Sequence, residues 1–397
     1  MKKNDWHAYL MRDVFERVEV PVNVEPDKEY VQIGIRSHGK GLFYKEPVLG
    51  KALGNKQVFW IQPNCFILNV VFAWEQAITK TTENEIGMIG SHRFPMYRPK
   101  NDLVDIDYLI YYFLTKSGTD ILEAASPGGA GRNRTLGQER FLKSKITLPP
   151  LPEQQKIAAI LSTQDKVIEL KEKLLAQKEQ QKKYLMQQLL TGKLRLPGVN
   201  GEWMTVKLKE LLSERNEKNV EQNHRICSVA VSKGVVDQIE HLGRSYAAAD
   251  TSNYGVAHYG DIIYTKSPTG DFSLGIIKQN RMRENVAVSP LYGIYKPISF
   301  STGYLLNVHF ESAINTKNYL TPIVQKGAKN TIAISNSVFL ENKILFPMDE
   351  ATRSKIAKIF ELTDHEIDML QKSIEAEKQK KKALMQLLLT GKVSVRI

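Results

Sequence analysis

Cysteine is scarce in this chain of 397 residues, which contains Cys65 and Cys227 and no other. Two cysteines so far apart supply neither a disulfide framework nor the close pairs that bind zinc. Long apolar runs are missing too, since the longest, from Cys65 to Trp74, is too short to cross a membrane. No apolar segment follows Met1, so we expect no signal peptide. These absences predict a cytoplasmic protein with reduced thiols, no metal site and no membrane segment.

Catalytic motifs are also missing. The chain has no Asn-Pro-Pro-Tyr or Asp-Pro-Pro-Tyr sequence, with which an amino-methyltransferase would hold its target amine. Its glycine-rich runs, at 39–41 and 128–131, lack the spacing of a P-loop or a dinucleotide fingerprint. The eight histidines are scattered along the chain. We therefore predict that the chain is not an enzyme and holds no cofactor of its own.

What the sequence does contain is a duplication. Residues 156–193 align without a gap with residues 355–392 at an offset of 199, and 18 of the 38 aligned positions are identical in the printed sequence. The match extends upstream, where Tyr97-Arg98-Pro99 aligns with Tyr295-Lys296-Pro297 and Trp6 with Trp203. The chain is therefore two copies of one unit, each a variable region followed by a conserved helical segment.

We divide the chain accordingly. The expected segments are a first variable region at 1–151, a first helix at 152–193, a linker at 194–202, a second variable region at 203–348, a second helix at 349–392 and a tail at 393–397. The runs Phe66-Ile67-Leu68 and Ile262-Ile263-Tyr264 follow turn residues and predict strands. Short apolar runs separated by turn residues, without βαβ alternation, predict an α+β fold with strand-rich variable regions.

The repeated segments predict long helices that pair. Pro152 suits a first helical turn, and Thr191-Gly192 and Thr390-Gly391 supply stops. One line of residues seven apart is apolar in both copies except for Lys182 and its counterpart Lys381. A second line is interrupted by Gln164, Lys171 and Lys178. We expect a coiled coil with pseudo-two-fold symmetry, whose interface residues are Ile157, Leu161, Ile168, Leu175 and Leu189 in the first helix and Ile356, Phe360, Ile367, Ile374 and Leu388 in the second.

Basic residues outnumber acidic ones by 55 to 43, a net charge of +12 that suits a polyanionic partner. Polar and basic side chains also gather in glycine-rich stretches, where arginine and lysine can hold phosphates or read guanine and asparagine can pair with adenine. The residues predicted to bind DNA are Arg36, His38, Lys40, Arg93, Arg132, Asn133, Arg134, Lys278, Arg281, Arg283, Lys326, Lys329 and Asn330.

The repeated helices carry a family resemblance. The first opens Leu148-Pro149-Pro150-Leu151-Pro152-Glu153-Gln154-Gln155-Lys156-Ile157-Ala158, and both close on Leu-Leu-Thr-Gly-Lys. This pattern, repeated after two variable regions, resembles the specificity subunits of type I restriction-modification enzymes over essentially the whole chain. The second opening, from Phe346 to Ala357, lacks the Glu-Gln pair, which leaves the start of the second helix in doubt.

The resemblance implies a function for each segment. Each variable region would be a target-recognition domain that binds one half of a bipartite double-stranded DNA site, and the paired helices would form an antiparallel spacer. Two methyltransferase subunits would dock on the conserved regions, carrying S-adenosylmethionine and the adenine chemistry, and two motor-nuclease subunits can join them. The chain would thus direct methylation and cleavage by its partners.

Two other functions remain open at this point. The first is a DNA-modifying enzyme with an unrecognised site, which methyl-transfer assays on the purified chain would reveal. The second is a coiled-coil adaptor that binds proteins alone, which would lack salt-dependent binding to duplex DNA.

Overall fold

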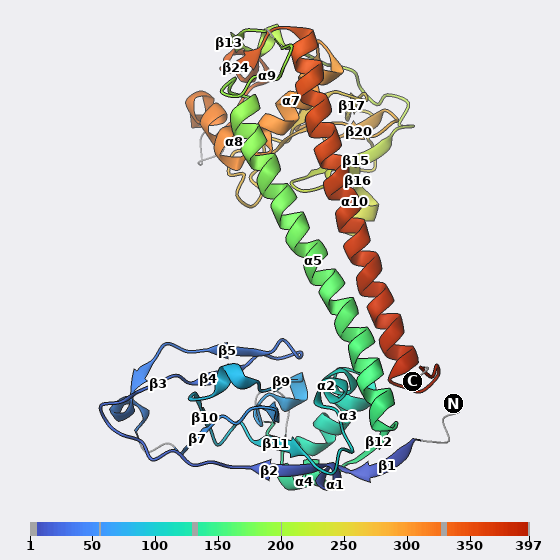
Figure 1. Ribbon diagram of the computed structural model, residues 1–397. Coiled ribbons are helices and arrows are strands. Elements are labelled where there is room, and N and C mark those ends of the chain that lie inside the picture. Colours follow the sequence, from blue (N-terminus) through green and yellow to red (C-terminus); the bar gives the residue numbers. More distant parts are fainter. Residues whose placement is uncertain (1–5, 55–56, 129–133, 200, 327–331, 396–397) are drawn as a thin grey trace. The chain divides into compact units, whose positions relative to one another are not determined.

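We describe a computed structural model of the chain at residues 6–54, 57–128, 134–199, 201–326 and 332–395 (Figure 1). The chain folds as two compact units, one of Met1–Glu172 with Lys372–Ile397 and the other of Lys173–Gln371. Each unit contains one variable region and parts of both long helices. Within the described ranges, no helix is both long and apolar enough to cross a membrane.

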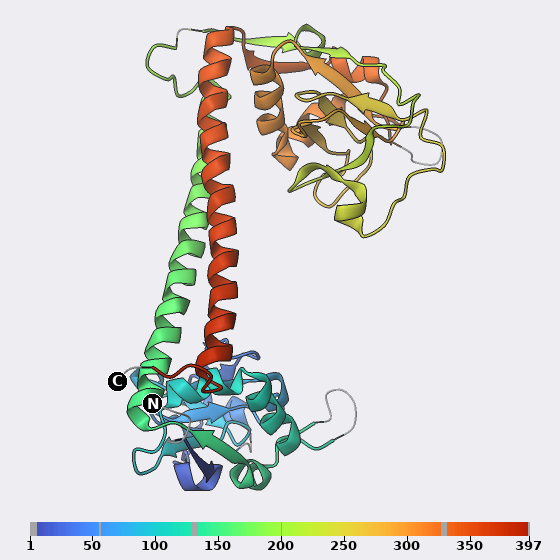
Figure 2. The same ribbon diagram turned by 90° about the vertical axis from the view of Figure 1, so that its right-hand side faces the viewer.

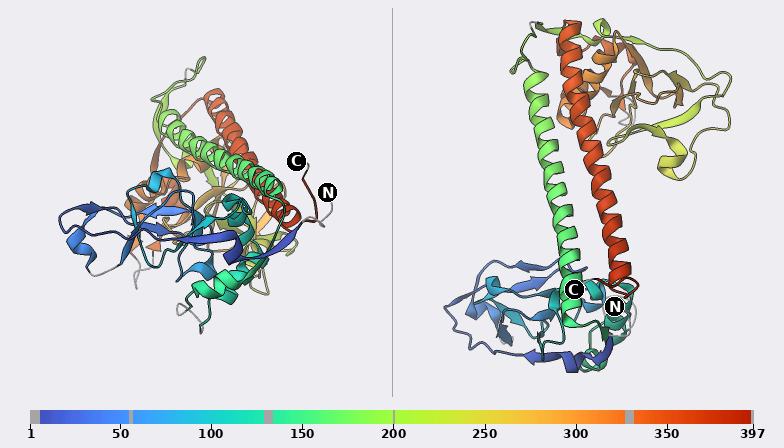
Figure 3. Two further views of the ribbon diagram at one scale, coloured as in Figure 1. Left: turned by 60° about the horizontal axis from the view of Figure 1, so that its bottom comes forward. Right: turned by 45° about the vertical axis from the view of Figure 1, so that its right-hand side comes forward.

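The variable region of unit 1 is built on small antiparallel sheets. Its strands are β1 (His7–Leu10), β2 (Phe15–Val18), β3 (Glu29–Tyr30), β4 (Ile33–Ile35), β5 (Leu42–Tyr44), β6 (Val48–Leu49), β7 (Val58–Trp60), β8 (Phe66–Leu68), β9 (Ile78–Lys80), β10 (Ile89–Ser91), β11 (Met96–Pro99) and β12 (Lys145–Leu148). The central sheet has the order β2-β11-β8-β9, and β1 pairs with β12. Its short helices are α1 (Met11–Val14), α2 (Ile106–Phe113), α3 (Lys116–Ala125) and α4 (Gln138–Lys143). Figure 3 shows this region, in blue and cyan, from two further sides.

The variable region of unit 2 repeats this plan. Its strands are β13 (Trp203–Lys207), β14 (Leu212–Glu214), β15 (Arg225–Ala230), β16 (Gly234–Asp237), β17 (Gly255–Ala257), β18 (Ile262–Tyr264), β19 (Ile277–Gln279), β20 (Val286–Val288), β21 (Gly293–Pro297), β22 (Gln325–Lys326), β23 (Ile332–Ala333) and β24 (Lys343–Pro347). The sheet β14-β21-β18-β19 corresponds to β2-β11-β8-β9, and β13 pairs with β24 as β1 does with β12.

The helices of unit 2 complete the repeat. They are α6 (Gln238–Leu242), α7 (Phe300–Phe310), α8 (Ala313–Leu320) and α9 (Asn336–Glu341). In Figure 2 the orange helices of this region lie beside the red helix α10. The two strands predicted from sequence, Phe66–Leu68 and Ile262–Tyr264, are confirmed as β8 and β18.

Two long helices follow the variable regions, α5 (Leu151–Leu189) and α10 (Glu350–Leu388), each of 39 residues. Both end before a glycine in the left-handed region, Gly192 at φ +70° and Gly391 at φ +67°. A Cβ on Gly192 would lie 2.9 Å from the Trp203 ring, and one on Gly391 3.2 Å from the Trp6 ring. Glycine therefore suits both stops, because it accepts this backbone conformation and lets a tryptophan approach closely.

Each unit has a core that joins the variable region to both helices. In unit 1, aromatic side chains such as Phe66 and Phe141 pack with Leu161 of α5 and Leu388 of α10. In unit 2, Tyr295 and Phe339 belong to the same cluster as Leu189 of α5 and Phe360 of α10. The sequence prediction of two strand-rich regions followed by long helices that pack together is confirmed.

Candidate nucleic-acid interface

The hairpin between β4 and β5 carries three of the predicted DNA-binding residues of unit 1. Arg36, His38 and Lys40 are all exposed at its tip. His38 and Gly39 have φ values of +60° and +63°, which turn the chain tightly there. The Arg36 guanidinium lies 5.4 Å from the centre of the Phe43 ring and also donates a hydrogen bond to the Leu42 carbonyl. The hairpin therefore presents its basic groups from a defined backbone.

This hairpin tip rests on the loop between β8 and β9. The backbone N–H of His38 donates to the Glu75 carbonyl at 2.8 Å, and that of Gly39 to the Gln76 carbonyl at 2.9 Å. The Ser37 hydroxyl also donates to the Glu75 carboxylate at 3.0 Å. These bonds join segments almost 40 residues apart, so the tip has a fixed place beside residues 69–77.

Two further arginines lie around the same loop. The Val70 N–H donates to the Arg93 carbonyl at 2.9 Å, and the Leu136 N–H donates to the Val70 carbonyl at 2.8 Å. Arg134 lies over the Trp74 ring at 5.5 Å. Arg36, His38, Lys40, Arg93 and Arg134 thus stand on three segments that contact one loop, and we name this set the basic edge. Two other predicted residues, Arg132 and Asn133, lie outside the described ranges.

The predicted residues of unit 2 do not share one surface. Lys278 lies in strand β19 at 7% exposure, so the expectation that it stands in a loop is wrong. Burial lowers its pKa, although the charge of Glu311 opposes that shift. Arg281 covers the Tyr304 ring at 4.1 Å and reaches Asp364 at 3.6 Å, so it faces the long helices. Arg283 is exposed. Of the rest, Lys326 lies in β22, and Lys329 and Asn330 lie outside the described ranges.

The structure suggests basic residues that the sequence reasoning missed in unit 2. Like β4–β5 in unit 1, β15–β16 in unit 2 is an antiparallel hairpin, and exposed Lys233 stands at its tip before Gly234, as Lys40 stands before Gly41. Arg244 lies over the ring of Tyr246 at 4.5 Å, and Tyr246 is 58% exposed. The repeat could have revealed Lys233, because both tips carry a Lys-Gly pair.

The predicted helix-interface residues have two surroundings. Ile157, Leu161 and Leu388 belong to the core of unit 1, while Ile356, Phe360 and Leu189 belong to the core of unit 2. Ile168 and Ile374 are buried, at 8% and 5% exposure, and Leu175 and Ile367 are half-buried. The apolar ends of the helices therefore also pack on the variable regions.

The polar positions between those ends have partners on the opposite helix. In unit 1, Gln164 donates to the Glu377 carboxylate at 2.8 Å and Lys171 lies 2.7 Å from the same carboxylate. In unit 2, Lys178 lies 2.7 Å from Glu366. In both units a higher residue number on α5 meets a lower one on α10, so the helices run antiparallel (Figure 1). The three interruptions of the apolar pattern are thus cross-helix contacts.

The start of each helix is anchored to the strand before it. Buried Gln154 donates through its amide to the carbonyls of Pro149 at 2.8 Å and Leu103 at 2.9 Å. Its counterpart in the second copy is Arg353, whose guanidinium donates to the carbonyls of Pro347 at 3.1 Å and Met348 at 2.6 Å. The second copy lacks the Glu-Gln pair, but Arg353 fills the same place.

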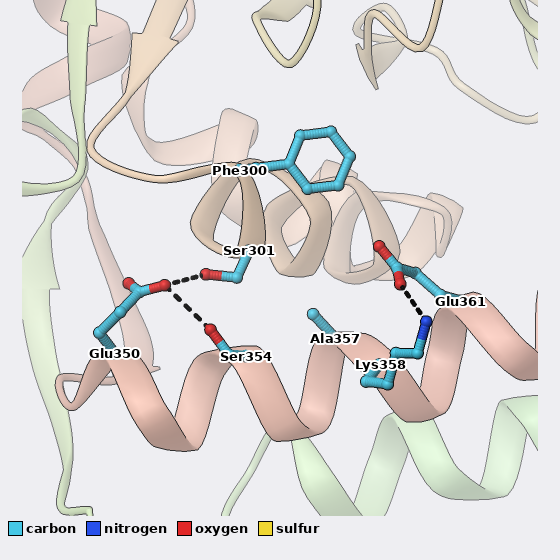
Figure 4. Close-up of a pocket in the computed structure, with 7 residues that line it drawn as sticks. All are labelled: Phe300, Ser301, Glu350, Ser354, Ala357, Lys358 and Glu361. Atoms are coloured by element: carbon cyan, nitrogen blue, oxygen red, sulfur yellow. Dashed lines mark hydrogen bonds and ion pairs between the residues drawn. The ribbon is translucent and has the colours of Figure 1, made fainter.

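A shallow hollow lies beside the start of α10 (Figure 4). It has a volume of about 290 Å³ and lies between α7 and α10. Its polar groups bond to one another, since Glu350 accepts from Ser301 at 2.5 Å and from Ser354 at 3.1 Å. Lys358 lies 3.4 Å from Glu361. The hollow therefore presents mutually satisfied side chains, and we assign it no chemistry.

The duplicated fold and the antiparallel helix pair define a class of protein, a two-unit scaffold with one variable region in each unit. Residues 23–180 match the family described as type I restriction modification DNA specificity domain. The type I restriction enzyme MjaVIII specificity subunit of Methanocaldococcus jannaschii is 26% identical, over 75% of this chain and 72% of that protein.

Two solved structures have the same fold. The HsdS subunit from Thermoanaerobacter tengcongensis superposes with a TM-score of 0.52 at 18% identity, over 98% of this chain and 97% of the other. The type I restriction-modification S subunit from M. genitalium superposes with a TM-score of 0.58 at 14% identity, over 96% of both chains. The protein is thus similar to type I restriction-modification specificity subunits in sequence over residues 23–180, and in fold over nearly the whole chain.

Proposed function

We propose that this chain is a specificity subunit that reads a bipartite double-stranded DNA target without catalysing a reaction itself. Unit 1 would bind one half of the site through its basic edge, and unit 2 would bind the other through its own loops. The observation that carries this proposal is the repeat of one architecture in both units, with the sheet order and the helix contacts preserved. A net charge of +12 suits the phosphate backbone.

The partners would supply the chemistry. Two methyltransferase subunits would carry S-adenosylmethionine and methylate adenine, and motor-nuclease subunits would cleave DNA. Leu170 on α5 and Met369 on α10 are equivalent positions of the repeat, and they are 53% and 52% exposed. Two equivalent apolar side chains on the two helices suit two copies of one partner. Changing Leu170 or Met369 alone to Glu should reduce the bound methyltransferase from two copies to one, measured by the mass of the complex.

The decisive experiment maps methylated adenines in DNA from cells that contain this chain and its methyltransferase partner. We expect one asymmetric target, made of two short sequences separated by a fixed number of unspecified base pairs. Methylation at one continuous sequence would contradict the bipartite proposal. Methyl transfer by the purified chain alone would favour the enzyme alternative, and the absence of DNA binding by the complex would favour the adaptor.

The basic edge can be tested by salt dependence. Replacing Arg93 and Arg134 with Ala should flatten the slope of log affinity against log salt by about 2, because each lost phosphate contact removes about 0.9 from it. Arg12→Ala is the matched control, since Arg12 lies on α1 beside Asp13 at 3.9 Å. An unchanged slope in the double variant would exclude these arginines from phosphate binding.

A further inference from the structure

In each unit, three elements meet at one aspartate. In unit 1 this is Asp165 of α5, whose Oδ1 lies 2.5 Å from the Lys381 ammonium of α10. Its Oδ2 accepts a hydrogen bond from the Tyr111 hydroxyl of α2 at 2.8 Å. The Lys381 ammonium also lies 5.5 Å from the centre of the Tyr111 ring. One carboxylate thus joins both long helices to a helix of the variable region.

Unit 2 contains the same arrangement with the long helices exchanged. Asp364 of α10 places Oδ1 2.6 Å from the Lys182 ammonium of α5. Its Oδ2 accepts from the Tyr304 hydroxyl of α7 at 2.5 Å. Here Arg281 supplies the cation over the tyrosine ring, at 4.1 Å. The two aspartates and the two lysines are equivalent positions of the repeat, and these lysines are the ones that interrupt the apolar line.

Tyr111 and Tyr304 do not occupy equivalent places in their helices, although both donate to equivalent aspartates. Tyr111 is the sixth residue after the N-cap of α2, Asp105, whereas Tyr304 is the fifth after the N-cap of α7, Ser299. The variable regions therefore supply their hydroxyls from different positions in the helix, yet each hydroxyl donates to the aspartate at the equivalent position of the repeat. Shared ancestry of the long helices explains the aspartate and the lysine, but it does not by itself explain this repeated meeting with a tyrosine.

The lysine in unit 2 is held in its charged form. Burial alone would lower the pKa of Lys182, but the carboxylates of Glu311 and Asp364 raise it above its usual value. A hydrogen bond to a charged carboxylate is stronger and more directional than one between neutral groups. The tyrosine hydroxyl therefore favours one orientation of its variable region on the ends of the helices.

We infer that Asp165–Lys381–Tyr111 and Asp364–Lys182–Tyr304 are positioning sites that orient each recognition domain on the helix pair and so set the spacing at which the two half-sites are read. This inference rests on the proposed function, because spacing has meaning only for a bipartite target. The residues act through the orientation of the domains and need not touch DNA.

The test uses the full chain with its methyltransferase partner and three DNA substrates. One carries the native spacing, one a spacer shorter by one base pair and one a spacer longer by one. Tyr111→Phe and Tyr304→Phe remove only the hydroxyl and keep the ring. We expect each change to lower the preference for the native spacing about tenfold, since that is the scale of one hydrogen bond to a charged group.

Tyr319→Phe is the control for a purely structural loss. Its hydroxyl donates to the Phe339 carbonyl at 2.6 Å, so this bond joins two residues of the variable region and involves neither long helix. This variant should unfold more easily and keep the spacing preference. If Tyr111→Phe and Tyr304→Phe instead lower activity equally on all three DNA substrates, the inference is wrong and the proposed function stands. If the unaltered complex shows no spacing preference, the proposed function fails and the inference fails with it.

Discussion

His309 illustrates how one residue of α7 ties stability to pH. It is partly buried and makes an edge contact with Phe310 at 5.0 Å between ring centres. Burial lowers its pKa to about 4 from an ordinary value of 6.5. The unfolded chain therefore takes up a proton at a higher pH than the folded chain, so stability is full above about 6.5 and falls as the pH drops toward 4.

The expected loss of unfolding free energy follows from this shift of the pKa. Between pH 7 and pH 5 unit 2 should lose about 2 kcal/mol of unfolding free energy, because each pKa unit corresponds to about 1.4 kcal/mol. His309→Gln should remove this part of the pH dependence, measured by urea unfolding at both values. His92→Gln, at an exposed position, serves as the control. Equal pH dependence in His309→Gln and the unaltered chain would contradict the assignment.

Single residues also show where sequence reasoning reached its limit. The pattern of basic residues at 278–283 predicted one DNA-binding loop, but Lys278 pairs into β19 and is buried. Its place depends on which strands become neighbours, which no local pattern records. Likewise, the missing Glu-Gln pair left the start of α10 uncertain from the sequence. Arg353 replaces the missing glutamine by bonding to the carbonyls of Pro347 and Met348, and these bonds can be recognised only in the folded chain.

At the scale of elements, the long helices were the most predictable feature. Periodicity, Pro152 and the terminal glycines are local signals, and α5 and α10 follow them closely. The partners of the polar residues that face the opposite helix were not predictable. The pairing of Lys171 with Glu377 depends on the register of the two helices, which the sequence does not give. The basic edge was unpredictable as a unit for the same reason, since long-range backbone bonds assemble it.

The continuous helices lead to a prediction about the spacer. Duplicating residues 166–172 after Glu172 and residues 365–371 after Gln371 adds one heptad to each helix at equivalent positions. The line of residues along which the two helices pair, which we call the helix seam, is preserved. Seven residues add about 10 Å at about 1.5 Å per residue, which matches roughly three base pairs of about 3.4 Å. Methylation mapping should show the same two half-sequences separated by about three more base pairs.

The control for this prediction is an insertion of three residues at the same two positions, which breaks the seam and should reduce binding at every spacing. If the heptad variant methylates at the original spacing, the helices do not set the distance between the half-sites. A changed half-sequence would instead indicate that the helices influence base reading itself.

At the scale of the whole molecule, the duplication predicts that one half can pair with itself. The residues at the C-terminal end of α10 and directly after it that enter the core of unit 1 are Leu384, Met385, Leu388 and Leu389. Their counterparts in the core of unit 2 are Leu185, Met186, Leu189 and Leu190. The two sets are identical in kind. A half-chain of residues 1–196 should therefore form a two-fold dimer, in which the Leu185–Leu190 segment of each copy completes the core of the other.

The polar middle of the seam would oppose this dimer. In the full chain Lys171 lies 2.7 Å from Glu377, but the counterpart of Glu377 in the first copy is Lys178, so two lysines would face each other. Changing Lys178 to Glu in the half-chain should restore an opposite charge at both symmetric contacts. Since each pair contributes up to about 1 kcal/mol and like charges are removed as well, dimerisation should tighten at least about tenfold.

The measurement is the dissociation constant of the half-chain dimer by sedimentation equilibrium, with and without Lys178→Glu. Lys183→Glu is the matched control, because Lys183 is exposed and the same charge change there faces solvent. With its methyltransferase partner, the dimer would carry two copies of the first recognition domain and should methylate a palindrome of the first half-sequence. A folded monomer that Lys178→Glu leaves monomeric would show that the helix seam does not have the two-fold character that the repeat implies.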